Sequence, residues 1–412
     1  MNIKWRALSA LTITLMACTE PISVPHPDGA DLLASSPDPH HDGEGGATIF
    51  WSGVARELFR ENLVSPPLVL RGYAVLGVAQ YAAVVSAGRG PDRTRKPGLR
   101  AAVSGASVVA LSYLFPEDAA RLEEILDRYL DSKPRRIQRQ HHASPDEDFG
   151  RAIGTRVVEY AKTDRFLDPW TGTVPVGPGL WFSTADPPAL PAGASFGDAR
   201  PYLLLSTDQF RPAPPPEFES PAFKAGLAEV REISDSRTAR QDSIAKFWSF
   251  EPGTNPGPTY WYEVAMELAQ RYRLRERDAA HLLALVGVTA FDALLTSHEA
   301  KFTYWSIRPT QADPGIQLAI GLPNFPSYPS NHAVISSATA RILGARFPIE
   351  RERLDARAEE AALSRVFGGI HFRFDGEAGI RLGRTLAAWA LKRDAEIHEG
   401  LGDWMAAAGV LE

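Results

Sequence analysis

The sequence predicts an all-α protein: helical bundles packed in one large domain, with a long proline-rich ordered loop section. Apolar residues recur at the i, i+3 and i+4 spacing of a helix face through most of the chain, and no segment shows a competing strand pattern or an internal repeat. The 412 residues are 44% apolar and 23% charged, which is an ordinary globular mixture. The net charge of −6 argues against nucleic acid as a partner, so any bound anion must be attracted by a local cluster of cations.

The first residues have the features of a secretory signal. Lys4 and Arg6 form a short basic region, and the apolar stretch from Leu8 to Ala17 is too short to span a bilayer. Its end, Leu-Met-Ala-Cys, resembles the lipobox of bacterial lipoproteins, and Cys18 is the only cysteine of the chain. We therefore expect lipidation of Cys18; the alternative is a chance cysteine beside a conventional cleavage site.

This interpretation divides the chain into three parts. We expect residues 1–17 to be a lipoprotein signal peptide and residues 18–46, which are rich in Pro, Asp, Gly and Ser, to be a flexible tether. Residues 47–412 would form the all-α domain. The protein would be exported and lipid-anchored at the bacterial cell envelope, on the periplasmic face or the cell surface.

Helical periodicity defines most of the domain. Glu117, Asp118 and Asp146 stand where carboxylates help a helix to begin. No later stretch reaches eighteen apolar residues, so no transmembrane helix is expected. The predicted helices are Val69–Ala87, Arg100–Leu114, Ala119–Leu130, Asp148–Thr163, Ala222–Ser234, Ala239–Phe250, Tyr260–Tyr272, Arg277–Ala300, Asn331–Phe347, Arg351–Val366 and Gly376–Arg393.

A long irregular section is predicted between Asp164 and about Glu219. Proline lacks a backbone donor and blocks helix, and this section contains the segments VPVGPGLW, DPPALP and RPAPPPEF. Its aromatic residues argue for packing against the domain rather than disorder. They are Trp170, Trp181, Phe182, Phe196 and Phe210.

Three short segments carry the residues of a chemical site. In KFTYWSIRP, Lys301 and Arg308 are seven residues apart, which is two helical turns, so both can face one direction. Pro309 disfavours helix at the preceding residue and places Arg308 near a helix end. Taken singly, Lys301 reads as a solvated lysine and Arg308 as a member of a structural ion pair.

In FPSYPSNHAV, a proline is followed by Ser330, Asn331 and His332 at the expected start of a helix. Serine or asparagine at this position is an ordinary N-cap, but a histidine is not needed for capping. The alternative is an anion site, because a helix start presents unpaired N–H groups and a positive dipole end. This segment alone leaves both interpretations open.

In SRVFGGIHFRFD, Arg365 and His371 are six residues apart across the pair Gly368–Gly369, which allows a tight turn. Asp375 follows His371 by four residues and can orient its ring if this part is helical. Each residue has a structural interpretation on its own. Together, three cations, a helix start and two histidines are what a tetrahedral oxyanion needs.

Order and spacing in these segments resemble the signature of the vanadium-dependent haloperoxidases. Lys-x6-Arg-Pro, Pro-Ser-x-His and Ser-Arg-x5-His-x3-Asp cover residues 301–375, and the related type 2 phosphatidic acid phosphatases and bacterial acid phosphatases share them. More loosely, residues 208–218 and the segment Ser243–Trp305 resemble soluble bacterial haloperoxidase homologues. Vanadate and phosphate have the same shape and charge, so a pocket built for phosphoryl transfer also binds vanadate.

The resemblance implies a role for each matching residue. His371 would be the axial ligand of the vanadium or, in a phosphatase, the phosphorylated nucleophile. His332 would be the acid–base residue, and Asp375 would orient His371. The residues implied to bind the oxygens of vanadate, or of phosphate in the alternative, are Lys301, Arg308, Ser330, Asn331 through its backbone N–H, and Arg365.

Two positions depart from the family pattern. Asn331 stands in place of the usual glycine, where it tolerates a left-handed backbone but brings a side chain that can crowd or bond the oxyanion. His298 stands where haloperoxidases often carry tryptophan; with Phe325 it is implied to form the halide pocket, the alternative being a surface histidine. Asp292 is expected to pair with one of the arginines.

These features lead to an expected function and two alternatives. We expect a vanadate-binding enzyme that oxidises bromide or iodide with hydrogen peroxide. A small organic acceptor is the expected partner of the oxidised halide. The first alternative is an exported acid phosphatase that hydrolyses phosphate monoesters through a phosphohistidine. The second is a lipoprotein that only binds phosphate or vanadate, against which the two histidines argue. The expected partners also include the membrane, through the lipid anchor, and a second copy of the chain in a homo-oligomer.

Overall fold

The computed structural model describes residues 46–87, 98–130, 144–250 and 257–396, together with Met405, Gly409 and Val410. All of them belong to one compact unit, Pro37–Glu412. The predicted signal peptide, Cys18 and all but the last residue of the predicted tether lie outside the described residues.

The described residues form helices and no β-strand, which confirms the all-α prediction. Three short 3₁₀ helices, η1 (Pro116–Asp118), η2 (Phe196–Asp198) and η3 (Pro348–Glu350), accompany the α-helices. The α-helices are α1 (Gly46–Glu61), α2 (Pro66–Ala87), α3 (Leu99–Leu114), α4 (Ala119–Leu130), α5 (Pro145–Lys162), α6 (Pro221–Ser236), α7 (Ala239–Phe247), α8 (Tyr260–Arg271), α9 (Glu276–Tyr304), α10 (Pro309–Ala312), α11 (Asn331–Arg346), α12 (Arg351–Phe367) and α13 (Arg373–Glu396).

Every predicted helix is present, and two further helices, α1 and α10, were not predicted. Helix α1 has no acidic residue in its first turn. Instead the Glu276 carboxylate, at the start of α9, accepts the backbone N–H groups of Ala47 (2.9 Å) and Thr48 (2.8 Å). Because this cap comes from a distant residue, local start signals do not reveal the helix. Helix α10 is a single turn of four residues.

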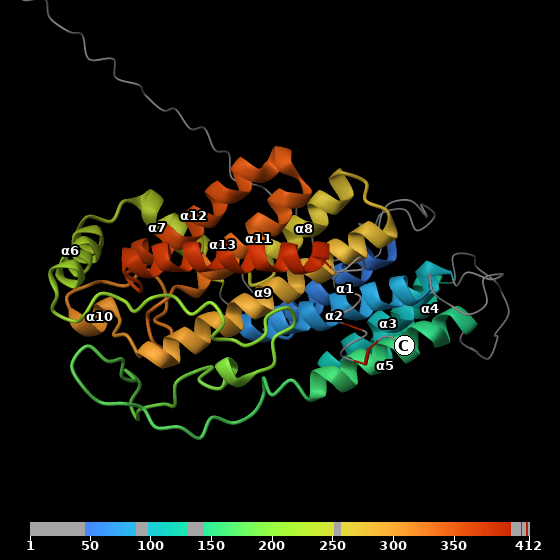
Figure 1. Ribbon diagram of the computed structural model, residues 1–412, viewed down its shortest axis with the longest axis horizontal. Coiled ribbons are helices and arrows are strands. Elements are labelled where there is room, and N and C mark those ends of the chain that lie inside the picture. The colour runs from blue at the N-terminus through green and yellow to red at the C-terminus, as the bar shows by residue number, and fades with distance from the viewer. Residues whose placement is uncertain are drawn as a thin grey trace, which may run out of the picture. The chain divides into compact units, whose positions relative to one another are not determined.

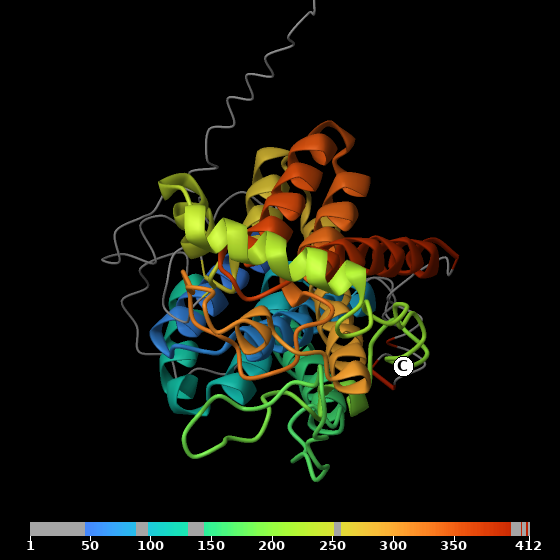
Figure 2. The same cartoon turned by 90° about the vertical axis from the view of Figure 1, so that its left-hand side faces the viewer.

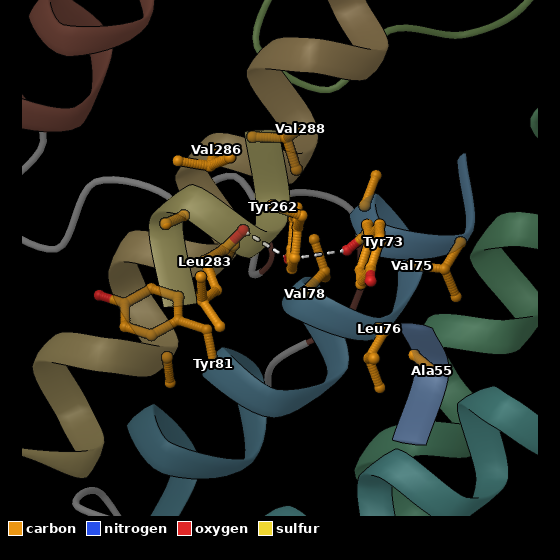
Figure 3. Close-up of a cluster of buried hydrophobic side chains, with 14 of the residues drawn as sticks. Ala55, Tyr73, Val75, Leu76, Val78, Tyr81, Tyr262, Leu283, Val286 and Val288 are labelled. Atoms are coloured by element: carbon orange, nitrogen blue, oxygen red, sulfur yellow. Dashed lines mark hydrogen bonds between the residues drawn. The ribbon is translucent and has the colours of Figure 1, made fainter. Parts of the chain in front are cut away.

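Helix α9 is the central element of the fold. It packs against α1 and α2 of the N-terminal part and against α11 and α13 of the C-terminal part (Figures 1 and 2). Helices α2 and α9 are long and apolar enough to cross a membrane by composition, but 89% and 94% of their apolar windows are buried inside the protein. They therefore serve as core helices here. The Tyr262 hydroxyl of α8 joins them, donating to the carbonyl oxygens of Tyr73 (3.2 Å) and Leu283 (2.7 Å) (Figure 3).

The proline-rich section between α5 and α6 is irregular, as predicted, and is attached to α9 and to the chain that follows it. Asp292 of α9 accepts the backbone N–H groups of Tyr202, Leu203 and Leu204 at 2.7, 2.7 and 3.3 Å. Asp292 therefore orders this section and does not pair with an arginine, because its oxygens are already used by the three amides.

The aromatic residues of this section pack unequally. Trp181 is buried, and its backbone N–H donates to the backbone carbonyl of Trp305 at 2.7 Å. This hydrogen bond lies next to a β-bridge between Leu180 and Ser306. Phe182 is half exposed, in contrast to the packing expected for it, because it follows the point where the chain leaves this bridge. The section thus contacts the chain that carries Arg308.

Helices α11 and α13 approach each other through glycines, and this contact sets the position of the predicted site. A Cβ atom at Gly379 would lie 2.6 Å from the Cβ of Ala333 and 2.9 Å from the carbonyl oxygen of Ser330. A Cβ atom at Gly383 would overlap the hydroxyl of Ser337 and the carbonyl oxygen of Val334. Only glycine permits this spacing between the helix that begins at Ser330 and the helix that follows His371.

We expect Gly383→Ala to destabilise the fold by about 1–3 kcal/mol, because the added methyl group must push α13 away from the backbone of Val334. The change is measured as the free energy of unfolding in a denaturant titration. Gly53→Ala is the matched control: no atom lies within 4 Å of a Cβ there, and alanine is the better helix former by roughly 0.5–1 kcal/mol. Equal stability of Gly383→Ala and the unchanged protein would contradict the prediction.

Candidate functional site

The three predicted segments meet at the start of α11. Lys301, Arg308, Ser330 and Asp375 are completely buried, and Arg365 and His371 are nearly so. Burial, together with the charge of Arg308, lowers the pKa of Lys301, and burial lowers the pKa of Arg308. Buried cations of this kind are stable only with partners of opposite charge or strong acceptors. The cluster therefore favours the binding of an anion.

Lys301 lies in the last turn of α9, and all of its donors are used by the loop that precedes α11. Its Nζ donates to the carbonyl oxygens of Pro326 (2.9 Å), Ser327 (2.7 Å) and Pro329 (2.6 Å). An ammonium group has three N–H donors, so none is left for a ligand in this arrangement. Lys301 thus shapes the loop and supplies positive charge, which differs from the direct ligand contact implied by the resemblance.

Arg308 reaches the cluster by a different route from the predicted one. Helix α9 ends at Tyr304, and the chain turns at Trp305, which has a φ of 49°. Arg308 is therefore in extended backbone before α10, near a helix end as expected, but it does not share a helix face with Lys301. Its Nη1 donates to the Ile370 carbonyl (2.7 Å) and to Nε2 of His371 (3.1 Å).

Ser330 stands at the N-cap position of α11, but its side chain makes no capping hydrogen bond. Within the described part of the chain, Ser330 Oγ, Arg308 Nη2 and His332 Nε2 are all buried without a hydrogen-bond partner. Buried polar atoms are rarely left unpaired, and each such atom requires an explanation. A bound oxyanion accounts for the two donors and favours the anion-site interpretation over simple capping.

His371 is oriented by Asp375 as expected, although it lies before α13 and not within a helix. Its Nδ1–H donates to Oδ2 of Asp375 at 2.8 Å, so the lone pair is on Nε2. The same oxygen accepts from Ser327 Oγ (2.6 Å) and Phe372 N (3.1 Å). Burial, followed by the charge of Arg308, lowers the pKa of His371 well below its usual value, and burial raises the pKa of Asp375 to about 6. The imidazole is therefore neutral. Its Nε2 lone pair, which accepts from Arg308 Nη1 in this arrangement, can act as a ligand or nucleophile when that hydrogen bond is given up.

The turn before His371 depends on its two glycines. Helix α12 ends at Phe367, Gly369 has a φ of 79°, and Ile370 N bonds to the carbonyl of Arg365 at 3.1 Å. This positive φ is costly for other residues. The turn brings His371 back towards Arg365.

His332 lies in the first turn of α11, and only one of its two ring nitrogens has a hydrogen-bond partner among the described residues. Its ring bonds to the Trp248 carbonyl, which also accepts from Nη1 of Arg365 at 2.6 Å. Because Nε2 has no partner, the bonded nitrogen is Nδ1 and the lone pair is on Nε2. Burial, followed by the charge of Arg365, lowers the pKa of His332 well below its usual value. This neutral imidazole is suited to accept a proton.

The two departures from the family pattern contact each other. His298 is buried, and not at the surface; its Nδ1 bonds to the Gly193 carbonyl at 3.0 Å, and its Nε2 accepts from Nδ2 of Asn331 at 3.0 Å. Asn331 is the first residue of α11 and has no positive φ, so the left-handed backbone that asparagine tolerates is not used here. Burial lowers the pKa of His298 to about 3, so this ring is uncharged. Its centroid lies 5.4 Å from that of Phe325.

A cavity of about 330 Å³ opens onto this cluster. The site residues that line it are His298, Phe325, Asn331, His332, Arg365 and His371. The four other predicted residues stand behind this lining: Arg308 and Asp375 contact His371, Lys301 contacts the loop, and Ser330 precedes Asn331. The structure thus brings all of the predicted site residues from His298 to Asp375 into one cluster; Cys18 lies outside the described residues.

The sequence analysis missed Ser327 and Trp248. Ser327 is fully buried and donates to Asp375, and its place in the same FPSYPSNH segment was the signal that could have found it. Trp248 acts through its carbonyl oxygen, which bonds both Arg365 and His332. No pattern of side chains in a sequence reveals a backbone contact of this kind.

Comparisons with known proteins agree with this geometry. Residues 281–397 match the model of the PAP2 superfamily. A search among curated proteins finds no match. Among solved structures, the chain is similar to the first bacterial vanadium-dependent iodoperoxidase, with a TM-score of 0.72, 24% identity, and coverage of 84% of this chain and 94% of that chain.

It is also similar to holo-type and apo-type structures of bacterial vanadium-dependent chloroperoxidase. Both have a TM-score of 0.65 and cover 84% of this chain, with identities of 15% and 14% and coverage of 93% and 95% of those chains. At these identities the similarity establishes the fold. The comparisons agree with the resemblance seen in the sequence: residues 281–397 match the PAP2 superfamily, and the chain has the fold of the bacterial vanadium-dependent haloperoxidase structures.

Proposed function

We propose that the protein is a vanadate-binding haloperoxidase that oxidises bromide or iodide with hydrogen peroxide. The observation that carries the proposal is the cluster at the start of α11. Two neutral histidines, buried cations and unpartnered donors occur together there, beside an apolar cavity wall. The similarity to haloperoxidase structures over 84% of the chain supports it.

The residues present fit an oxyanion of the charge and shape of vanadate. Arg308 Nη2 and Ser330 Oγ, directly behind the cavity lining, are donors without partners among the described residues, and Arg365 lines the cavity itself. These groups, with the backbone N–H of Asn331, would bind the oxygens, while Nε2 of His371 would bind the central atom. Lys301 would contribute charge through the loop. Bound vanadate would supply a Lewis acid for peroxide without a change of oxidation state.

The chain's own groups then perform three tasks. His332 accepts a proton from hydrogen peroxide through its free Nε2. Asp375 and Arg308 keep His371 in the tautomer with its lone pair on Nε2. Phe325 and the uncharged His298 exclude water from the halide side, where a low dielectric strengthens the electrostatic interactions of the site.

A second function uses the same atoms. Residues 281–397 match the PAP2 superfamily, and type 2 phosphatidic acid phosphatases share the sequence signature of this site. A phosphate monoester has the same tetrahedral charge distribution as vanadate. In that case Nε2 of His371 would be phosphorylated, and His332 would protonate the leaving alcohol.

Export and lipid anchoring through Cys18, and a homo-oligomeric state, remain proposals that rest on the sequence.

The proposal is tested with the purified, desalted protein, hydrogen peroxide, and iodide or bromide, with and without orthovanadate. We expect halide oxidation to require vanadate and to be lost in His371→Ala, because that variant lacks the ligand for the central atom. The halide oxidation rate is the measurement. Hydrolysis of a phosphate monoester that vanadate inhibits, with no halide oxidation, would replace this function with the phosphatase.

We expect His332→Ala to lower the turnover number by roughly 10²- to 10⁴-fold while vanadate affinity changes little, because the ring moves a proton and is not needed to bind the oxyanion. Steady-state kinetics and equilibrium vanadate binding measure the two quantities. His281→Ala is the control, since His281 pairs with Asp394 at 2.8 Å outside the cavity. Unchanged turnover in His332→Ala would remove this role.

Asp375→Asn is expected to weaken vanadate binding by roughly 10- to 100-fold, because the His371 Nδ1–H loses its carboxylate acceptor and the tautomer with an unprotonated Nε2 is no longer favoured. Equilibrium binding of vanadate is the measurement. Asp394→Asn is the matched control, because it alters the same type of histidine–aspartate contact at His281. Equal affinities of the two variants would show that the carboxylate does not orient His371.

A further inference from the structure

The cavity at the site continues far beyond the groups that the proposed reaction uses. On α9 it is lined by Val286, Ala290, Leu294 and His298, which recur every four residues and so form one stripe of the helix. Twelve residues of helix correspond to a length of about 18 Å. The cavity is therefore a chamber that begins at His298 and extends along α9 towards its N-terminal half.

Helix α11 forms a second wall. His332, Ile335, Ser336 and Thr339 line the chamber at the spacing of one helix face. The Ser336 hydroxyl is used, because it accepts the indole N–H of Trp261 at 2.8 Å. The Thr339 hydroxyl is completely buried and has no partner in the described part of the chain. The wall thus presents one unused hydroxyl group.

Aromatic rings close the far end. Tyr73 of α2 and Tyr262 of α8 stack with their centroids 3.6 Å apart and an interplanar angle of 15°. Figure 3 shows the Tyr262 hydroxyl bonded to the carbonyls of Tyr73 and Leu283. The Tyr73 hydroxyl is buried and has no partner among the described residues, and burial raises its pKa, so it keeps its proton and remains a donor. Trp261 and Phe250 add further rings to the lining.

The chemistry of the lining selects the type of ligand. Among the described lining residues, Arg365 alone carries a permanent charge, and it belongs to the site end, so the remainder of the described lining suits an uncharged molecule. The walls are carbon-rich and aromatic, which favours a ring that packs edge to face or offset. A hydroxyl on the ligand would give either of the two hydroxyls, of Thr339 or of Tyr73, the hydrogen-bond partner that it lacks among the described residues. An apolar cavity of about 150 Å³ binds benzene, so about 330 Å³ accommodates a substituted ring.

We propose that this chamber binds a small phenol, which is held beside the site as the acceptor of the oxidised halogen. The binding part stands on the chamber itself, and the acceptor part rests on the proposed function. In that step the hypohalous acid formed from halide and peroxide transfers its halogen to a ring carbon. The carbon–halogen bond forms, the oxygen–halogen bond breaks, and the displaced ring proton leaves with hydroxide as water.

The binding part is tested by calorimetric titration of the full chain with 4-ethylphenol, without vanadate, halide or peroxide. We expect saturable binding that Thr339→Val weakens roughly 3- to 10-fold, through loss of one hydrogen bond. Thr289→Val is the matched control: Thr289 is also buried with an unpartnered hydroxyl, but it does not line the chamber. Ala290→Phe is expected to abolish binding by filling the chamber.

The results separate the possible failures. If 4-ethylphenol does not bind the unchanged protein, the chamber is overturned as the binding site. The same conclusion follows if Thr339→Val, Thr289→Val and Ala290→Phe all bind 4-ethylphenol with equal affinity. Ethylbenzene binding as tightly as 4-ethylphenol overturns the role of the hydroxyl groups. Phenol binding without any halide oxidation supports the chamber and overturns the proposed function instead. Thr339→Val preserves the shape of the side chain and is expected to fold. The test therefore still decides the question if Ala290→Phe fails to fold.

The acceptor part is tested by comparing two reactions of one variant. Oxidation of iodide to triiodide needs no organic acceptor, so Ala290→Phe is expected to retain it. The same variant should lose at least about 10-fold in kcat/KM for halogenation of 4-ethylphenol, since the added ring occupies the place of the phenol and a tenfold loss corresponds to only about 1.4 kcal/mol of binding free energy. Equal loss, or no loss, in the two reactions overturns a bound acceptor and indicates reaction of released hypohalous acid in solution.

Discussion

The ammonium group of Lys301 is the contact on which the rest of the site depends. It lies completely buried at the end of α9 and binds three carbonyl oxygens of the 326–329 loop. A buried ammonium satisfied in this way determines the path of the loop, because no water can replace the three acceptors. That path delivers Ser327 to Asp375 and places Ser330 at the first turn of α11. The same positive charge contributes to keeping His332 and His371 neutral.

The two histidines have similar environments but different partners, and this difference separates their tasks. His371 gives its Nδ1–H to a carboxylate that is itself bonded by Ser327 and by the backbone, which fixes the ring and makes its Nε2 electron-rich. His332 bonds only a backbone carbonyl that it shares with Arg365, so it is oriented without a compensating negative charge. A ring of this kind gains a proton readily once an anion neutralises the nearby cations.

The pair formed by His298 and Asn331 shows how one site accommodates two unusual residues. Asparagine at the first position of α11 would leave a buried amide unpaired beside an apolar wall. His298 accepts one of its N–H groups and passes its own Nδ1–H to the Gly193 carbonyl, so a continuous chain of hydrogen bonds results. The ring remains neutral because burial and Lys301 both disfavour its charge. His298 therefore adds no charge beside Phe325, whose ring centroid lies 5.1 Å from both Lys301 Nζ and Arg308 Cζ.

Helical periodicity and motif spacing by themselves determined the all-α class, the predicted helices and the residues of the cluster, because helix faces and short-range turns such as Gly368–Gly369 are local properties. Only the tertiary structure decided how those residues are used. Helix α1 is capped by Glu276, Asp292 binds backbone amides, and Lys301 binds a loop, and each of these partners is distant in sequence or belongs to the backbone. The chamber beyond His298 arises from the packing of α2, α8, α9 and α11, which no single segment encodes.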